Sequence, residues 1–173
     1  NTHAPTLAEQ WELVHAFPQE HYIRDLHFAA TANAFTTREV IDEIGPFLSA
    51  YASGGDREFG ERAWGAGCTL AFEPGAVIRH PARHSMKALL RKVVRTTTGY
   101  YRRQREEKNW SAYARGRAII RAAREIPWGP GHGVGAALGI EGDSGAKLRY
   151  AVAETAVHIV RQSSIVYEAT RRG

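Results

Sequence analysis

The apolar residues of this chain recur mostly at helical spacing, and helix-capping patterns precede several of these segments. A capping-box pattern, T-x-x-E, occurs at residues 6–9 and predicts a helix over residues 7–16. The same pattern at residues 36–39 predicts a second helix, which Gly45 and Pro46 would end. These short helices indicate a folded domain in the first part of the chain.

Residues 53–67 read SGGDREFGERAWGAG and have an apolar face at helical spacing. We expect a short amphipathic helix with Asp56 at its N-cap and Gly67 as its C-terminal stop. A carboxylate at the mouth of a turn can act as a general base, and it can equally be an ordinary helix cap. The pattern alone leaves both interpretations open.

Three segments have the composition of strands, and the end of the chain is helical. Residues 23–32, 69–72 and 76–79 are the predicted strands, with a turn at Glu73-Pro74-Gly75 between the last two. The helices expected after these strands begin at three positions: Ser85, Asn109 and about residue 146. Glycine and proline are frequent over residues 126–145, which predicts a linker.

The net charge of +5 conceals a strong asymmetry along the chain. Residues 1–78 have a net charge of −7, residues 79–124 have +12, and the remainder is balanced. The basic block, residues 79–124, includes interleaved tyrosine and tryptophan residues. Such a block favours a polyanionic partner: a lipid surface, a diphosphate or a nucleic acid.

Three motifs occur in the order known from one enzyme family. They are FAATANAFTTREVIDEIGPF at residues 28–47, SGGDREFGERAWGAG at residues 53–67, and LAFEPGAVIRHPARHS at residues 70–85. In this order they resemble the C-terminal half of the GT-A domain of family 2 glycosyltransferases. The resemblance covers about residues 5–100, and three motifs in register make it more specific than any one of them.

The resemblance implies an α/β fold: a partial GT-A sheet with flanking helices, followed by a mostly helical C-terminal tail. It divides the chain into four parts: residues 1–84 as the C-terminal half of a GT-A domain, 85–125 as a basic helical extension, 126–145 as a linker, and 146–173 as a C-terminal amphipathic helix.

The implied activity is inverting transfer of a sugar from a nucleotide-sugar donor to an acceptor hydroxyl. Asp56 matches the second acid of the family's E-D pair, which is the general base. Gly55 stands where the first acid is usual, so the chain departs from the family there. Gly54 and Gly55 would let an acceptor approach the backbone closely.

Four other residues match positions assigned to acceptor binding. Thr31 and Asn33 match a T-x-N segment, where the asparagine either positions the acceptor or holds the loop by local hydrogen bonds. Glu58 matches the acid two residues after the base, and it is equally a favourable first-turn acid. Arg62 matches the family's arginine, and an i, i+4 ion pair with Glu58 is its ordinary structural role.

A divalent metal, Mg or Mn, is the cofactor that the resemblance implies. His80, before Pro81, matches the family's closing H-P and would add one metal ligand, or it is a histidine bonded to the backbone. Arg83 would hold the donor's diphosphate, or it belongs to a solvated basic face. The main metal-binding motif, D-x-D, is absent from this sequence.

The missing motif limits what this chain is expected to do. We expect a fragment that lacks the donor-binding half and has little transferase activity alone. Its partners would be a nucleotide-sugar donor and a saccharide or lipid-linked acceptor, with peripheral membrane contact and no nucleic acid. A single cysteine, Cys68, and the absence of a long apolar run fit a cytoplasmic protein that contacts the inner membrane face.

Two other functions compete with this one. The basic block could make the chain a non-enzymatic module that binds nucleic acid or an anionic membrane surface. The chain could also be a degenerate, scaffolding relative of the enzyme, for which Gly55 at the first acid position is the argument.

Overall fold

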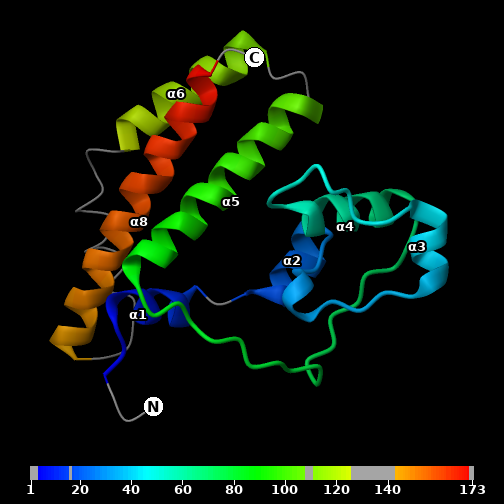
Figure 1. Cartoon of the computed structure of the whole chain (residues 1–173), viewed down its shortest axis with the longest axis horizontal. Helices are drawn as coiled ribbons and strands as arrows, with labels where there is room; N and C mark the ends of the chain where they lie inside the picture. The colour runs from blue at the N-terminus through cyan, green and yellow to red at the C-terminus, as the bar shows by residue number, and fades with distance from the viewer. Residues whose placement is uncertain (1–3, 16, 108–110, 126–142, 172–173) are drawn as a thin grey trace. The chain divides into compact units, whose positions relative to one another are not determined.

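The computed structural model describes residues 4–15, 17–107, 111–125 and 143–171. The chain divides into two compact units, coloured along the sequence in Figure 1. The first unit combines Asn1–Val14 with Ala82–Gly173, and the second unit is His15–Pro81. We describe each unit by itself.

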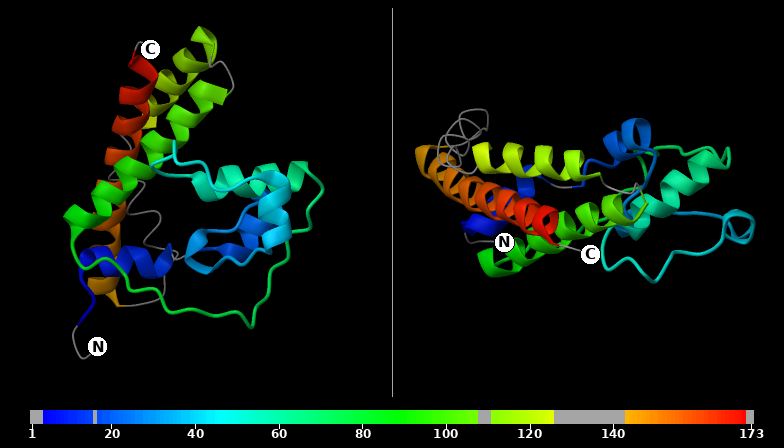
Figure 2. Two further views of the ribbon diagram at one scale, coloured as in Figure 1. Left: turned by 45° about the vertical axis from the view of Figure 1, so that its right-hand side comes forward. Right: turned by 90° about the horizontal axis from the view of Figure 1, so that it is seen from above.

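The first unit is built of helices that pack on one long central helix. These are α1 (Leu7–Val14), α5 (Met86–Glu107), α6 (Ala112–Glu125) and α8 (Ser144–Thr170). Helices α1, α5 and α6 all contact α8, as the views in Figure 2 show. The buried core of this unit consists of Ala8, Trp11, Leu89, Val93, Tyr150, Ala151, Ala153 and Val157.

Local caps explain where these helices begin. The predicted capping box is confirmed: the Thr6 N–H donates to Glu9 Oε2 at 2.9 Å, and the Glu9 N–H donates to Thr6 Oγ1 at 3.2 Å. Ser85 caps α5 by accepting the Ala88 N–H at 3.2 Å. Asp143 caps α8 by accepting the Ala146 N–H at 2.6 Å; this helix was expected to begin at about residue 146, and its cap was not predicted.

Polar contacts inside the first unit tie α1 to the other elements. Trp11 Nε1 donates to Glu154 Oε2 at 2.5 Å, which joins α1 to α8. Burial and the nearby Glu154 carboxylate raise the pKa of Tyr150 to about 12. Buried Glu12 accepts Lys92 Nζ at 2.9 Å, which joins α1 to α5. These contacts satisfy polar groups that α1 would otherwise bury unpaired.

The second unit consists of short helices and irregular segments. They are α2 (Gln19–Leu26), η1 (Thr31–Asn33), α3 (Arg38–Ile44) and α4 (Gly55–Gly65). Its buried apolar residues are Phe28, Ala30, Phe59 and Ala63. The Phe59 ring stacks on the partly exposed Phe47 ring with centroids 4.3 Å apart, so an aromatic contact joins α4 to the segment after α3.

The expected α/β fold is wrong for the part of the chain that the structure describes, which contains helices and no strand. Residues 69–72 and 76–79 have no regular secondary structure. A strand is held by pairing with a neighbour. Here the Ala76 N–H donates to Glu73 O at 3.1 Å and the Val77 N–H donates to Gly75 O at 3.0 Å, so the predicted turn forms without a strand pair.

The strand expected over residues 23–32 is also wrong, because its first residues belong to α2. This helix has two side-chain contacts at i, i+4 spacing: an ion pair of Arg24 with Glu20 at 2.9 Å, and a contact between His21 Nδ1 and Asp25 Oδ2 at 2.6 Å. Such pairs favour a helix over a strand. The helix ends at His27, which adopts the left-handed conformation with φ of 55°.

The helix boundaries in the second unit were predicted with mixed success. The cap of α3 is Thr37, which accepts the Val40 N–H at 3.4 Å, so the capping box expected from Thr36 is shifted by one residue. The expected stop at Gly67 is confirmed: its φ is 88°, and the Cys68 N–H donates to Ala63 O at 3.0 Å. This is the Schellman arrangement, in which glycine avoids strain.

Some predictions fall outside the described residues. The linker expected over residues 126–145 lies mostly outside them, and so does Asn109, the expected cap of the following helix. Among the helices that the structure describes, none has the length and apolar character needed to cross a membrane.

Candidate active site

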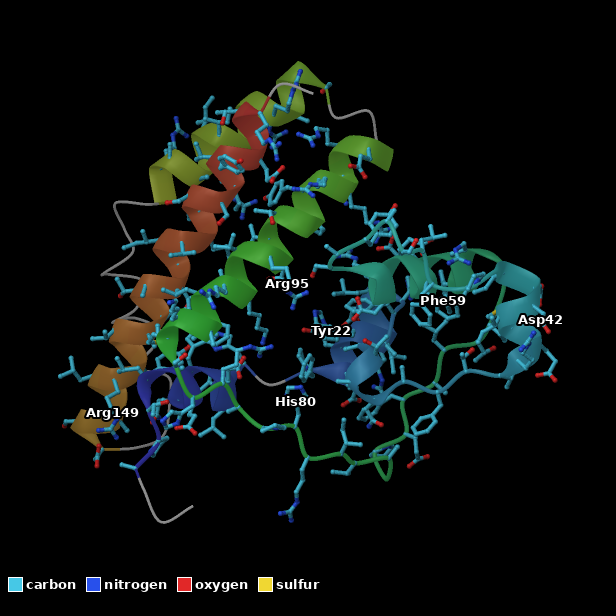
Figure 3. The ribbon with its side chains drawn as sticks, viewed as in Figure 1. Tyr22, Asp42, Phe59, His80, Arg95 and Arg149 are labelled. Carbon is cyan, nitrogen blue, oxygen red and sulfur yellow. The ribbon has the colours of Figure 1, made fainter. Side chains whose placement is uncertain are left out.

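A broad, open cavity of about 1480 Å³ lies within the second unit. Elements α2, η1 and α4 contribute to its wall, together with the irregular segment 68–80. Four of the residues predicted for the site line it: Thr31, Asn33, Asp56 and His80. Residues that are far apart in the sequence are thus brought to one surface. Figure 3 labels two of the lining residues, Phe59 and His80.

Asp56 lies in the first turn of α4, and not at its N-cap as expected. The N-cap is Gly54, whose φ of 84° is a left-handed conformation that favours glycine. Asp56 Oδ1 accepts the Arg57 N–H at 2.9 Å, and no other described residue hydrogen-bonds to Oδ2. The carboxylate is half-buried at the cavity wall. One of its oxygens therefore remains available to a hydroxyl in the cavity.

Tyr22 on α2 responds to the charge of Asp56. Burial raises the pKa of the Tyr22 phenol, and the negative charge of Asp56 raises it further. The ring of Tyr22 stacks on Phe28 with centroids 4.7 Å apart, which fixes its orientation. No sequence motif indicated this interaction, and Tyr22 lies just before the strand expected over residues 23–32.

Gln19 holds the T-x-N segment in place. Its Nε2 donates to Ala30 O and Asn33 O, each at 3.1 Å, and its Oε1 accepts the Ala30 N–H at 2.9 Å. Asn33 Nδ2 donates to Ala76 O at 2.5 Å, so this amide holds the facing loop. Thr31 is exposed at the cavity. The bond to Ala76 spans 43 positions, so it is not the local hydrogen bond expected for Asn33. Acceptor binding by Thr31 and Asn33 remains a prediction.

Glu58 and Arg62 form the predicted i, i+4 pair on α4. Arg62 Nε donates to Glu58 Oε1 at 2.8 Å, and Arg62 Nη2 donates to Glu58 Oε2 at 3.0 Å. Glu58 is only 8% exposed. The hydrogen bond to Glu58 raises the pKa of the Arg62 guanidinium, although burial opposes the change.

The same guanidinium also closes the C-terminal end of α3. Arg62 Nη1 donates to Ile44 O and, at 3.0 Å, to Gly45 O, while Nη2 donates to Pro46 O at 3.0 Å. Carbonyl groups at a helix C-terminus lack partners within the helix, so an arginine there satisfies them. Neither Glu58 nor Arg62 is part of the cavity wall, and their predicted contact with an acceptor remains a prediction.

Gly54 and Gly55 lie at the start of α4, beside the cavity residue Asp56. A β-carbon at Gly54 would meet no atom within 4 Å, whereas one at Gly55 would stand 3.7 Å from Tyr51 Cβ. The conformation of Gly54, and not crowding, therefore requires glycine at this position. Their role in acceptor binding remains a prediction.

His80 is exposed, and its ring meets the Phe17 ring edge-on with centroids 5.1 Å apart. Within the described ranges, no group of three or more His, Cys, Asp or Glu side chains could hold a metal ion. His80 would thus supply a single ligand, which is too few for a Mg or Mn site made by these residues alone. A metal held mainly by a D-x-D motif outside these residues, with His80 as a further ligand, remains a prediction.

Arg83 belongs to the first unit. Its backbone N–H donates to Glu12 Oε2 at 2.6 Å, and its Nη1 donates to Glu12 Oε1 at 2.7 Å. The guanidinium is therefore engaged in a half-buried ion pair that fixes the chain entering α5. Diphosphate binding by Arg83 remains a prediction that would have to compete with this pair.

Comparison with known proteins gives one significant similarity. The chain is 33% identical over 94 residues to the glycosyltransferase AglE of Haloferax volcanii. The aligned region covers 54% of this chain and 31% of that protein, so the chain spans about a third of the length of this relative. No protein-family model matches the chain, and no solved structure matches it. The similarity relates the chain to a glycosyltransferase and leaves the family and the fold class open.

Proposed function

We propose that this chain provides the acceptor side of an inverting glycosyltransferase, with Asp56 as the general base. The observation that carries the proposal is the position of Asp56: a carboxylate at the wall of a large cavity, with one oxygen to which none of the described residues hydrogen-bonds. The similarity to a glycosyltransferase over 94 residues supports the reaction class. In such a reaction a base must remove the proton of the attacking hydroxyl.

The lining of the cavity suits a saccharide. Aromatic rings can stack on the apolar faces of a sugar, and Phe35 is the most exposed of the phenylalanines that line the cavity, at 89%. Carboxylates and amides can bind the sugar hydroxyls. The acids Glu20, Asp25, Asp56 and Glu73 outnumber the single lining arginine, Arg24. This charge favours a neutral acceptor over the diphosphate of a donor.

The donor therefore requires groups that these cavity residues do not supply. A diphosphate is bound by cations, by a metal ion or by a helix N-terminus. We propose that donor binding and the D-x-D metal site are supplied by sequence other than these 173 residues. The chain by itself would then transfer little or no sugar.

The test is a transfer assay on the complete gene product, with nucleotide-sugar donors and oligosaccharide acceptors. Asp56→Asn keeps the size of the side chain and removes the base, so we expect kcat to fall by about 10²–10⁴-fold. Asp25→Asn is the matched control, because Asp25 lines the same cavity but pairs with His21 at 2.6 Å. Retained transfer by Asp56→Asn with an unchanged pH profile would exclude Asp56 as the base.

A further inference from the structure

A groove on the first unit combines cationic and apolar side chains. On α5, Lys87, Arg91 and Arg95 follow one another at i, i+4 spacing, and Leu90 and Val94 form the neighbouring row. The groove has a volume of about 660 Å³ and is lined by Lys87, Leu90, Arg91, Val94, Arg95 and Val160. Val160 comes from α8, so two packed helices form the groove.

The exposure of these residues defines what the groove can bind. Lys87, Arg91 and Arg95 are exposed, and Val94 is 41% exposed although its side chain is aliphatic. Figure 3 labels Arg95 on α5. The lining contains no acid, and the block of residues 79–124 around α5 has a net charge of +12. An occupant would therefore carry negative charge beside apolar groups.

We propose that this groove docks the chain on an anionic phospholipid surface. Long basic side chains can lay their alkyl stems along an apolar surface and extend their charged ends to lipid phosphates. The guanidinium groups of Arg91 and Arg95 suit phosphate oxygens, which they can bind through two hydrogen bonds each. Val94 is placed between these charges to reach the acyl boundary, as the apolar face of an interfacial helix does.

Two other occupants fit the groove less well. A single-stranded nucleic acid is held by bases stacked on aromatic rings, and the six lining residues include none. A specific protein interface uses about 20–30 residues a side, far more than this groove offers. Binding to an anionic lipid surface requires only a few basic residues, since each one contributes separately to the binding free energy.

The experiment is co-sedimentation of the full 173-residue chain with vesicles. Vesicles of phosphatidylcholine are compared with vesicles that also contain phosphatidylserine, at low and at high salt. We expect binding only to the vesicles with phosphatidylserine, and weaker binding at high salt because the charges are screened. Equal sedimentation with both vesicles, or none with either, would overturn the proposal.

Two triple variants, each of which removes three positive charges, test whether the groove is the lipid-binding surface. Lys87→Gln/Arg91→Gln/Arg95→Gln removes the cations of the groove, and we expect the affinity for phosphatidylserine vesicles to fall about a hundredfold, or about fivefold per charge. Arg117→Gln/Arg121→Gln/Arg124→Gln removes as many exposed cations from α6 and should lower the affinity far less. An equal loss in both variants would show binding by net charge and would refute the groove.

A third variant tests the apolar part without changing the charge. Val94→Asn replaces an exposed aliphatic side chain, so folding should be unchanged by circular dichroism while vesicle affinity falls by several fold. Unchanged affinity would exclude insertion of Val94. Tighter binding to a single-stranded oligonucleotide than to the vesicles would also overturn the proposal. This inference concerns the first unit, so its failure leaves the role proposed for Asp56 unaffected.

Discussion

Gly60 on α4 lies directly against the backbone of Phe28. A β-carbon at Gly60 would stand 2.5 Å from both Cα and Cβ of Phe28 and 2.8 Å from the His27 carbonyl oxygen. These distances are too short for any side chain, and the obstacle includes backbone atoms, which cannot rotate away. Because Gly60 has no β-carbon, helix α4, which carries Asp56, can pack directly against the backbone that follows α2.

Replacement of Gly60 by alanine should destabilise the second unit. The added methyl must push α4 away from Phe28, and overpacking of this kind costs about 1–3 kcal/mol. Native-state hydrogen exchange of the α4 amides would measure the loss. Gly65→Ala is the control on the same helix, because a β-carbon there meets nothing within 4 Å. Alanine is the better helix former, so this control should be neutral or stabilising by up to about 1 kcal/mol.

Arg62→Lys should loosen the junction between α3 and α4. Lysine cannot reproduce the paired hydrogen bonds to Glu58 and reach the α3 carbonyl groups at the same time. We expect the unfolding free energy to fall by about 2 kcal/mol. Arg57→Lys is the control, since Arg57 also pairs with an acid at i, i+4, Glu61 at 2.7 Å, and the Glu61 side chain is 39% exposed against 10% for Glu58. Equal losses from the two changes would contradict the bridging role of Arg62.

Asp56→Asn should lower the pKa of Tyr22. Burial is the larger cause of the raised pKa, and the charge of Asp56 adds to it, so removal of the charge leaves only the effect of burial. The phenolate would then form at a lower pH than in the parent chain. Titration of the Tyr22 ring by NMR measures the change. An unchanged pKa of Tyr22 in the variant would show that Asp56 is too far from Tyr22 to influence it.

Glu12→Gln should lower the unfolding free energy of the first unit at neutral pH. It should also make that free energy less dependent on pH in the acid range. Burial alone would raise the pKa of Glu12, but hydrogen bonds from Arg83 and Lys92 outweigh it and lower the pKa. A lowered folded-state pKa means that the stabilisation is present above the unfolded value of 4.5 and is lost as the pH falls through the folded value. We expect a loss of about 2 kcal/mol at pH 7.

The measurement for Glu12 is urea unfolding across the acid range. The parent should lose stability steeply below pH 4.5, and Glu12→Gln should lose less over the same range. Glu106→Gln, an exposed change on α5, should alter stability by less than about 0.5 kcal/mol. Parallel acid profiles for the parent and Glu12→Gln would show that Glu12 is not held as proposed.

The sequence predicted helices best where a local contact defines them. The Thr6–Glu9 box, the Ser85 cap and the Gly67 stop involve residues a few positions apart, so the pattern contains all of the necessary information. The strand predictions were wrong for the opposite reason. A strand depends on a partner elsewhere in the chain, and residues 69–72 and 76–79 have none among the described residues.

The candidate site shows the same division. Motif matching indicated Asp56, Asn33 and His80, and the cavity brings all three to its wall. The motifs gave no indication of Gln19, which holds η1, or of Tyr22, which senses Asp56. Both residues lie on α2 and interact with residues of other segments. A motif in the sequence does not reveal which segments will pack against each other.

The sequence by itself determined the Thr6 and Ser85 caps and the Gly67 stop, because each depends on residues adjacent or one turn apart. It also determined the charge asymmetry, which follows from composition, and it indicated the candidate acid Asp56. Only the tertiary structure decided that Arg83 pairs with Glu12, that Arg62 closes α3, and that Gly60 seats α4 on Phe28. These contacts join segments that are distant in the chain, and the free energy that selects them comes from burial and pairing in the folded state.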